Sequence, residues 1–432
     1  MTLLLTLVFV IGYVFIALEH SFKIDKAASA LLTGVFCWLV LLFGFEQMPA
    51  IQHLSGSIDK QHLLDEALFE HLGEISGILF FLLGAMTIVE LIDVHDGFRV
   101  ITDRITTTNR VKLLWVIAWV SFFVSAALDN MTTAIIMCAL LRKMMKGKDD
   151  IWLFGGFVVI AANAGGAWSP IGDVTTIMLW IGGQVSTVPV MTTLFLPSMA
   201  SLLVPLLVAS YFLKGKVQAA QNPKNNATTL TERNLIFGLG CFGLLFVPVF
   251  KAITHYPPYL GVMLSLGIVW AVTELLYRNH EDEHKQRFSV ATVLHRIDTP
   301  SILFFLGILL AVGALDTSGH LKQTAELLDE YVGNIYFINT IIGLLSAVVD
   351  NVPLVAAAMG MYPLSTYPAD SSFWNLLAYC AGTGGSILII GSAAGVASMS
   401  ILKIDFLWYL KRISGYALVG YLAGIAVYYW MH

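Results

Sequence analysis

Two aspartate–asparagine pairs lie inside runs of the sequence that are otherwise apolar. Asp129 and Asn130 belong to "FVSAALDNMTTAIIM", and Asp350 and Asn351 belong to "LLSAVVDNVPLVAAAM". An ionised aspartate at the centre of a membrane helix costs about 2.5–3.5 kcal/mol even on lenient insertion scales. A chain that keeps such a group twice, in similar surroundings, is expected to use the carboxylates to bind a cation or a proton.

A third acid, Asp173, lies in the glycine-rich segment "NAGGAWSPIGDVTT" and is the only charged residue between Asp150 and Lys214. Hard monovalent cations prefer several oxygen ligands. Hydroxyl and amide groups that could supply these ligands surround the three acids: Ser125, Asn130, Asn163, Thr175, Thr176, Ser346, Asn351 and Ser386. For any one Ser or Thr, a hydrogen bond back to its own helix is an equally simple role.

A buried carboxylate can hold a proton or a metal cation, but not both at once. Removal from water disfavours the charged form, so a cation that binds the ionised form must displace a proton. In a protein that opens alternately to the two sides of a membrane, this competition produces a cation/proton antiporter. A lone membrane aspartate can instead be a protonated or helix-capping group. Three of them, two in similar segments and each beside a helix break, favour the ion-binding role.

Two further acids, Glu74 and Asp298, stand just before the similar segments "SGILFF" and "PSILFF". We expect these acids to flank the ion site and to take part in proton coupling. The alternative is that each only begins a helix, where the helix dipole favours a negative charge.

The composition places these groups in a polytopic membrane protein of the all-α class. Of the 432 residues, 57% are hydrophobic and 12% are charged, which is about half the charged share of a typical soluble domain. Apolar runs of about 20 residues, the length that crosses the hydrocarbon core, recur along the whole chain. The alternating pattern of a transmembrane β-barrel is absent. The four cysteines lie singly in apolar segments, so we expect neither a disulfide framework nor a cysteine metal site.

The placement of Lys and Arg indicates the topology, because cytoplasmic loops collect basic residues. Basic clusters alternate along the chain with acidic or neutral stretches. With the clusters assigned to the cytoplasm, only Lys60, Lys251 and Lys322 fall on the other side.

This topology predicts two re-entrant helical hairpins. Residues 113–141 run between two basic clusters and are too few for two full crossings, so they are expected to enter and leave on one side, with Asp129 near the tip. By the same reasoning, residues of about 334–362 form a second hairpin that enters from the opposite face, with Asp350 near its tip.

The two halves of the sequence resemble each other. "SGILFFLLGAMTIVELID" is matched by "PSILFFLGILLAVGALD", "SAALDN" by "SAVVDN", and "NAGGAWSPIGDVTT" by "GTGGSILIIGSAAG", at offsets of 219 to 224 residues. The expected fold is therefore an inverted-topology repeat with two re-entrant hairpins and two broken transmembrane helices, with which many secondary transporters build a midplane site. The expected units are two leading transmembrane helices (1–73), the first repeat (74–213, broken helix about 151–182), a linker with two connecting transmembrane helices and a cytoplasmic loop (214–297), and the second repeat (298–432, broken helix about 373–402).

The motifs "SAALDNMTT", "NAGGAWSPIGDVTT", "SAVVDNVP" and "GTGGSILIIGSAAG" closely resemble those of the NhaD-type Na⁺/H⁺ antiporters of the ion transporter superfamily, over nearly the whole chain. The resemblance implies exchange of Na⁺ or Li⁺ for H⁺ across a bacterial inner membrane, in the service of pH homeostasis. It implies small cations and the lipid bilayer as partners, with no cofactor and no nucleic acid. Related members of the superfold form dimers, and the sequence does not decide between a monomer and a homodimer.

The resemblance also implies functional residues at both hairpins and both broken helices. Carried over by motif position, these residues are Ser125, Asp129, Asn130, Asn163, Asp173, Thr175 and Thr176 in the first half and Ser346, Asp350, Asn351 and Ser386 in the second, with Glu74 and Asp298 as flanking acids. The second break has Ser392 where the first has Asp173. We therefore do not expect ion sites with two-fold symmetry.

Two other functions fit part of this pattern. Relatives of the same superfold carry dicarboxylates, citrate or arsenite, but an aspartate at each hairpin tip would repel an anion. An intramembrane aspartyl protease also needs two buried aspartates. Those enzymes resemble a Tyr-Asp and Gly-x-Gly-Asp pair, whereas Leu128 and Val349 precede the two aspartates here. An inverted repeat would have no use in a protease.

Overall fold

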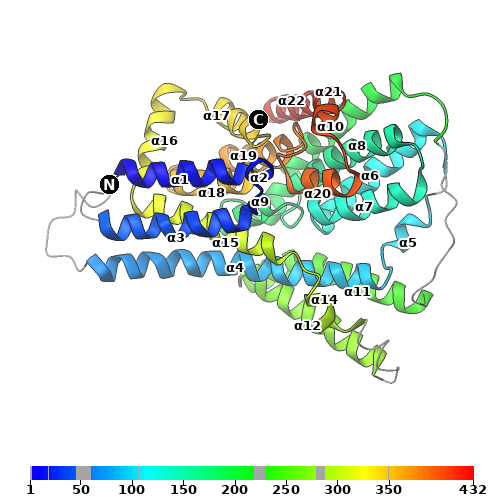
Figure 1. The fold of residues 1–432 in the computed structure, drawn as a ribbon, viewed down its shortest axis with the longest axis horizontal. Helices are drawn as coiled ribbons and strands as arrows, with labels where there is room; N and C mark the ends of the chain where they lie inside the picture. Colours follow the sequence, from blue (N-terminus) through cyan, green and yellow to red (C-terminus); the bar gives the residue numbers. More distant parts are fainter. Residues whose placement is uncertain are drawn as a thin grey trace.

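The structure, a computed structural model, is almost entirely helical (Figure 1). It describes residues 2–17, 19–44, 60–105, 107–217, 229–278, 288–348 and 350–432, so residues 218–228 of the predicted linker and 279–287 of the predicted cytoplasmic loop lie outside the described residues. The helices are α1 (Thr2–Ala17), α2 (Glu19–Phe22), α3 (Lys26–Gly44), α4 (Lys60–Val94), α5 (Arg99–Thr102), α6 (Arg110–Ala127), α7 (Asn130–Met144), α8 (Lys148–Ala167), α9 (Val174–Ile181), α10 (Thr187–Phe212), α11 (Leu230–Thr254), α12 (Pro258–Tyr277), α14 (Val290–Leu294), α15 (Thr299–Thr317), α16 (His320–Tyr331), α17 (Ile335–Leu345), α18 (Asn351–Met361), α19 (Ser372–Gly384), α20 (Ala393–Leu402), α21 (Phe406–Arg412) and α22 (Ser414–Met431).

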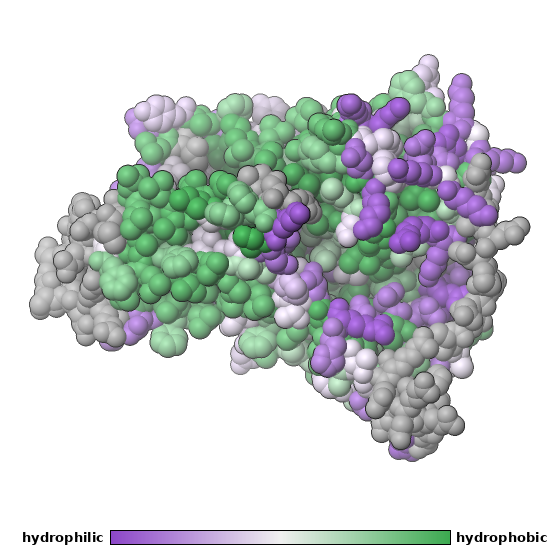
Figure 2. All heavy atoms as spheres, in the orientation of Figure 1, coloured by the Kyte–Doolittle hydropathy of each residue, from purple (hydrophilic) through white to green (hydrophobic). Residues whose placement is uncertain are grey.

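Eight helices among the described residues are long and apolar enough to cross a membrane: α3, α4, α6, α8, α10, α11, α12 and α15. Large apolar side chains such as Phe242 and Ile253 on α11 point away from the protein, as helices that face lipid require. Hydrophobic side chains also cover the face formed by α1 and α3 (Figure 2). The protein is therefore a multi-pass helical membrane protein, as its composition predicts.

Hydrophilic side chains gather at one end of the molecule, at the right in Figure 2. The helix ends that carry several basic residues meet there. Arg110 at the start of α6 forms an ion pair with Asp150 on α8, and Arg142 at the end of α7 donates to the Ile401 carbonyl on α20 at 3.4 Å. We call this the basic end of the protein. It corresponds to the side that the sequence predicts to be cytoplasmic.

Helices stop where polar or glycine-rich segments interrupt the sequence. Residues 128–129 separate α6 from α7, 346–350 separate α17 from α18, 168–173 separate α8 from α9, and 385–392 separate α19 from α20. A further bend of 117° separates α20 from α21. Each break leaves backbone groups without helical partners, which at membrane depth must lie inside protein or face a cavity.

Two of the helices that lead into breaks, α8 and α19, form the centre of the core. Every residue from 154 to 167 on α8 and from 373 to 384 on α19 is buried. Small residues in "AANAGGA" and "CAGTG" leave room for neighbouring backbones. As a result, α8 contacts α6, α7, α10, α19 and α20 along its length.

One close backbone contact recurs in both halves of the chain. A Cβ atom on Gly165 of α8 would lie 2.1 Å from the Phe122 carbonyl oxygen of α6, and one on Gly384 of α19 would lie 2.0 Å from the Gly343 carbonyl oxygen of α17. Only glycine fits at either position, because no side chain can occupy that space. These contacts hold α6 against α8 in the first half and α17 against α19 in the second.

Candidate functional site

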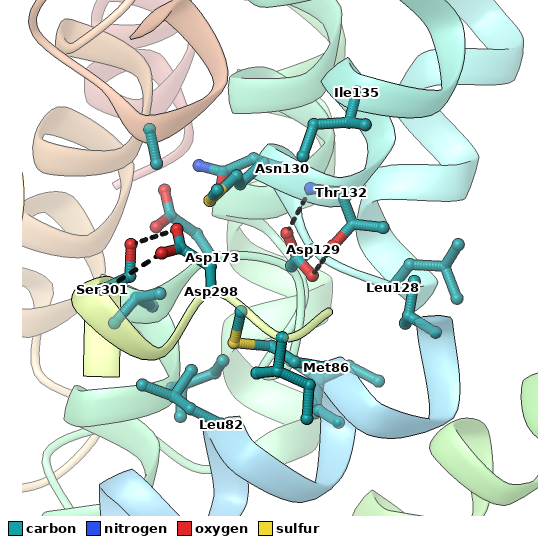
Figure 3. Close-up of a pocket in the computed structure, with 18 of the residues that line it drawn as sticks. Leu82, Met86, Leu128, Asp129, Asn130, Thr132, Ile135, Asp173, Asp298 and Ser301 are labelled. Carbon is teal, nitrogen blue, oxygen red and sulfur yellow. Dashed lines mark hydrogen bonds between the residues drawn. The ribbon is translucent and has the colours of Figure 1, made fainter. Parts of the chain in front are cut away.

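A cavity of about 160 Å³ lies among the helix breaks (Figure 3). Its wall includes one face of α4, the break between α6 and α7, and the first residues of α3, α9, α15, α18 and α20. Six of the predicted site residues line it: Asp129, Asn130, Asp173, Asp298, Asp350 and Asn351. The structure therefore brings together four of the five acids that the sequence predicts at the site, namely Asp129, Asp173, Asp298 and Asp350.

Asp129 is the N-cap of α7 and lies at the cavity wall (Figure 3). The backbone N–H and the hydroxyl of Thr132 both donate to its carboxylate, each at 2.7 Å. A helix start leaves its first N–H groups unpaired, and an aspartate at the N-cap accepts from one of them. The helix dipole also favours a negative charge at this position. Asp129 thus caps a helix and lines the cavity at the same time.

Asp173 caps α9 in the same way, with the Thr175 N–H donating to Oδ1 at 3.2 Å. The residue is only 2% exposed, and its Oδ2 has no hydrogen-bond partner among the described residues. Capping alone does not need a carboxylate, because Ser392 caps α20 at the corresponding place in the second half. A buried carboxylate oxygen without a partner is costly unless a proton or a cation occupies it. The free oxygen of Asp173 is therefore a candidate ligand.

A buried chain of polar side chains joins the two halves behind the cavity. Asn130 Nδ2 donates to Asn163 Oδ1 at 3.1 Å, and Asn163 Nδ2 donates to Ser392 Oγ at 2.9 Å. The residue of α19 that corresponds to Asn163 is Gly382, and a Cβ atom on it would lie 3.3 Å from Asp173 Oδ2. Because glycine has no side-chain donor, the hydrogen bond made by Asn163 has no counterpart at Asp173. This difference between the halves leaves Oδ2 of Asp173 without a hydrogen-bond donor among the described residues.

Asp350 caps α18 and accepts two hydrogen bonds. The Val352 N–H donates to Oδ1, and the ammonium of Lys26 donates to Oδ2, each at 3.3 Å. Lys26 is the first residue of α3 and lines the cavity. The placement of basic residues in the sequence predicts that Lys26 belongs to the cytoplasmic side, and the structure places its ammonium in the cavity wall beside Asp350. The ion pair is therefore a contact between the leading helices and the start of α18.

Five predicted ligands with hydroxyl groups lie behind the cavity wall instead of in it: Ser125, Ser346, Ser386, Thr175 and Thr176. The three serines donate to backbone carbonyl groups. Ser346 and Ser386 donate to carbonyl groups of their own helices, which is the alternative role that the sequence left open, whereas Ser125 on α6 donates to the Ala162 carbonyl of α8. The two threonines are fully buried, and their hydroxyl groups have no hydrogen-bond partner among the described residues.

The flanking acids Glu74 and Asp298 lie in different places. Asp298 caps α15, accepting from the Ser301 N–H at 3.2 Å, and lines the cavity near Asp173 (Figure 3). Glu74 lies within α4 and faces a second cavity of about 370 Å³, which it shares with His71 and Asp316. Asp298 therefore begins a helix and also lines the cavity, whereas Glu74 does not begin a helix and lies away from this cavity.

Four charged residues of the cavity wall were not predicted: Lys26, Glu90, Asp93 and Arg296. The signal for Glu90 and Asp93 is their spacing from Met86, because residues three and four apart share a face of a helix. Nη1 of Arg296 lies 3.9 Å from Oε1 of Glu90, at the end of α4. The wall then holds six acids and two bases, an excess of negative charge that attracts cations.

The described residues contain no group of three His, Cys, Asp or Glu side chains that could hold a metal ion together. A cation in the cavity would rest on one or two carboxylates, with amide, hydroxyl or carbonyl oxygens beside them. Such oxygen ligands suit hard cations.

Comparisons with known proteins find transporters over nearly the whole chain. A family model described as citrate transporter matches residues 13–378. Sodium/proton antiporters 1 and 2 of Arabidopsis thaliana are 48% and 46% identical over 99% of this chain, which covers 72% and 99% of their lengths. The Na⁺/H⁺ antiporter NhaD of Vibrio cholerae is 32% identical over 98% of this chain and 90% of its own length.

Proposed function

We propose, because this chain belongs to the citrate transporter family and to the NhaD-type Na⁺/H⁺ antiporters, that it exchanges Na⁺ or Li⁺ for H⁺ by alternating access. Like its relatives it is a transporter and not an enzyme. The aspartates that line the cavity bind the cation and the proton in competition.

The open Oδ2 of Asp173 is the observation that carries this proposal. Asp129, Asp173 and Asp350 line one cavity of about 160 Å³. Like charges in so small a space repel one another strongly, so the site needs compensating positive charge. A proton or an alkali cation on Asp173 meets this need, and each excludes the other. Exchange follows if the site opens to one side with a cation and to the other side with a proton.

Two cavities on the same helices support alternating access. The first cavity extends along α4 to Glu90 and Asp93, toward the basic end. The second, with Glu74, lies toward the other end of α4, and α9, α15 and α18 contribute to both cavities. On α9 the two cavities approach each other at adjacent apolar residues, with Ile177 lining the first cavity and Met178 lining the second. A shift of the helix breaks against α4 and α15 would open one cavity and close the other.

We further propose that residues 74–213 and 298–432 are inverted repeats, with α6–α7 and α17–α18 as re-entrant hairpins. The recurring contacts of Gly165 and Gly384 support this duplication. So do the helix caps, which fall at corresponding positions in the two halves. An inverted arrangement also explains why the corresponding acids Glu74 and Asp298 face cavities toward opposite ends of α4.

Transport of citrate is a second candidate, favoured by the description of the family model. The cavity wall opposes it, because six acids and only two bases line the site. One of the bases, Lys26, is already paired with Asp350. A multiply charged anion would meet repulsion from the remaining acids.

Reconstitution in lipid vesicles tests the two functions together. With an imposed pH gradient and a lumenal pH dye, we expect addition of Na⁺ or Li⁺ to dissipate the gradient, and we expect citrate to leave it unchanged. K⁺ in the same assay measures selectivity. Dissipation by citrate without any response to Na⁺ would establish anion transport in place of cation exchange.

We propose the inner membrane of a bacterium as the location, with pH homeostasis as the role, from the resemblance to NhaD-type antiporters. Fractionation of cells that express the tagged protein tests the location. Growth at alkaline pH in high Na⁺ or Li⁺, with and without the protein, tests the role.

Gly382→Ala is expected to raise the KM for Na⁺ about tenfold, equivalent to about 1.4 kcal/mol of binding. The added methyl group would lie 3.3 Å from Asp173 Oδ2, where the cation is proposed to bind. The measurement is the Na⁺ dependence of exchange in vesicles. Gly415→Ala is the control, since a Cβ atom there meets nothing within 4 Å. Equal KM values for the two variants would place the cation elsewhere.

A further inference from the structure

Lys26 is held beside Asp350 by close packing between two helices. One turn further along α3, Ala30 lies against Gly307 of α15, where a Cβ atom on the glycine would come within 2.4 Å of the Ala30 backbone. One turn before Gly307 lies Phe304, and the Lys26 ammonium is 4.4 Å from the centre of its ring. A cation over an aromatic face is favoured. The position of Lys26 is therefore set by the packing of α3 on α15.

Asp129 before α7 and Asp350 before α18, which we call the aspartates of the first and second tips, have different hydrogen-bond partners. At the first tip, Thr132 gives Asp129 a backbone N–H and a hydroxyl, each at 2.7 Å. The residue that corresponds to Thr132 at the second tip is Pro353, which has neither an N–H nor a hydroxyl to donate. Asp350 instead accepts from the Lys26 ammonium at 3.3 Å. The second tip thus lacks two neutral donors and holds a cationic one.

The ion pair belongs to the cavity. The side chains of Lys26 and Asp350 are 26% and 19% exposed, and both line the wall. The other base of the wall, Arg296, lies close to Glu90 at the end of α4. An ammonium carries the same charge as an alkali cation and approaches the same carboxylate oxygens. Lys26 therefore stands where an alkali cation bound to Asp350 would stand.

We propose that Lys26 is a built-in cation that occupies the alkali-ion position at Asp350 and confines the transported cation to Asp129 and Asp173. This inference rests on the proposed function. The Lys26 ammonium and Na⁺ exclude each other at Asp350, as H⁺ and Na⁺ exclude each other at Asp129 and Asp173. The two corresponding aspartates therefore have different roles, and the exchanger has one alkali-ion site instead of two.

Removal of the charge at Lys26 leaves the Asp350 carboxylate with the Val352 N–H as a neutral donor but without a positive charge beside it, and a carboxylate in a cavity without a counter-charge needs a new counter-ion. At saturation, Lys26→Gln is therefore expected to bind about twice as much Na⁺ as the wild type. Lys26→Met, which keeps an apolar stem for the Phe304 ring, is expected to show the same doubling. Lys26→Arg keeps the charge and is expected to match the wild type. In Lys26→Gln/Asp350→Asn the extra ion is expected to disappear.

The measurement is equilibrium binding of radioactive sodium to the purified full-length protein, with size-exclusion profiles to show that each variant is folded. Saturation of Lys26→Gln and Lys26→Met at the wild-type level would overturn the proposal. A doubling that persists in the double variant would overturn it as well, because the extra ion would then not be on Asp350. The proposed function has a separate failure: wild-type binding that survives in both Asp129→Asn and Asp173→Asn.

Discussion

Asp173→Asn is expected to reduce Na⁺/H⁺ exchange about 100-fold, which corresponds to about 2.7 kcal/mol. Asparagine caps a helix as well as aspartate does, so α9 keeps the hydrogen bond from the Thr175 N–H. The variant loses only the negative charge on the oxygen that has no partner in the described structure. The measurement is the initial rate at which Na⁺ dissipates a pH gradient in vesicles.

Asp405→Asn is the matched control for this variant. Asp405 caps α21, accepting from the Trp408 N–H at 2.8 Å, and lies outside the cavity wall. The chemical change is the same, and exchange is expected to stay at the wild-type rate. If Asp173→Asn and Asp405→Asn both exchange at that rate, the carboxylate of Asp173 is a capping group and no ion site.

Gly384→Ala is expected to lower the free energy of unfolding by about 1–3 kcal/mol, the usual cost of an overpacked core. The added Cβ would lie 2.0 Å from the Gly343 carbonyl oxygen, and a backbone atom cannot move aside as a side chain can. Gly165→Ala, against the Phe122 carbonyl, is expected to have a similar cost. The unfolding midpoint of the purified protein in detergent measures both.

Gly267→Ala is expected to change the free energy of unfolding in the opposite direction. Gly267 lies in the middle of α12, and a Cβ atom there meets nothing within 4 Å. Alanine favours a helix over glycine by about 1 kcal/mol, so this variant is expected to unfold at a higher temperature than the wild type. A Gly384→Ala protein as stable as Gly267→Ala would show that α17 and α19 do not pack as described.

The convergence of Asp129, Asp173 and Asp350 was predictable from the sequence. Each carboxylate is the only charge in a long apolar run, and the matching segments imply that their breaks meet. Because lone charges at membrane depth must face a cavity or a partner, the sequence could place all three in one site. Their exact partners were not predictable, since those depend on neighbouring helices.

Lys26 shows why part of the site was missed. Its distance to Asp350 depends on how α3 packs on α15, and the glycine that permits that packing, Gly307, lies 281 residues away in the sequence. Nothing local to "FKIDKAASA" marks an ammonium that lines a cavity. The charge of this segment therefore predicts only that it lies on the cytoplasmic side.

The contacts of the serine hydroxyls could not be predicted for a related reason. Ser125 lies in the same motif as Asp129, but it donates to the Ala162 carbonyl of α8 at 2.6 Å. A serine in such a motif can pack one helix against another as readily as it can bind an ion, and only the position of the neighbouring helix distinguishes the two roles. Glu74 and Asp298 were predicted to flank one site, but they line different cavities, because Glu74 lies within α4 and Asp298 caps α15.

Proton release on Na⁺ binding tests the central claim most directly. Purified protein in a weakly buffered detergent solution receives NaCl, with choline chloride as the control for ionic strength, and the pH is followed. Because a cation that binds ionised carboxylates must displace their protons, we predict release of about one proton per Na⁺ bound near neutral pH, and none in the Asp129→Asn/Asp173→Asn double variant. Na⁺ binding by the wild type without any release of protons would contradict the account.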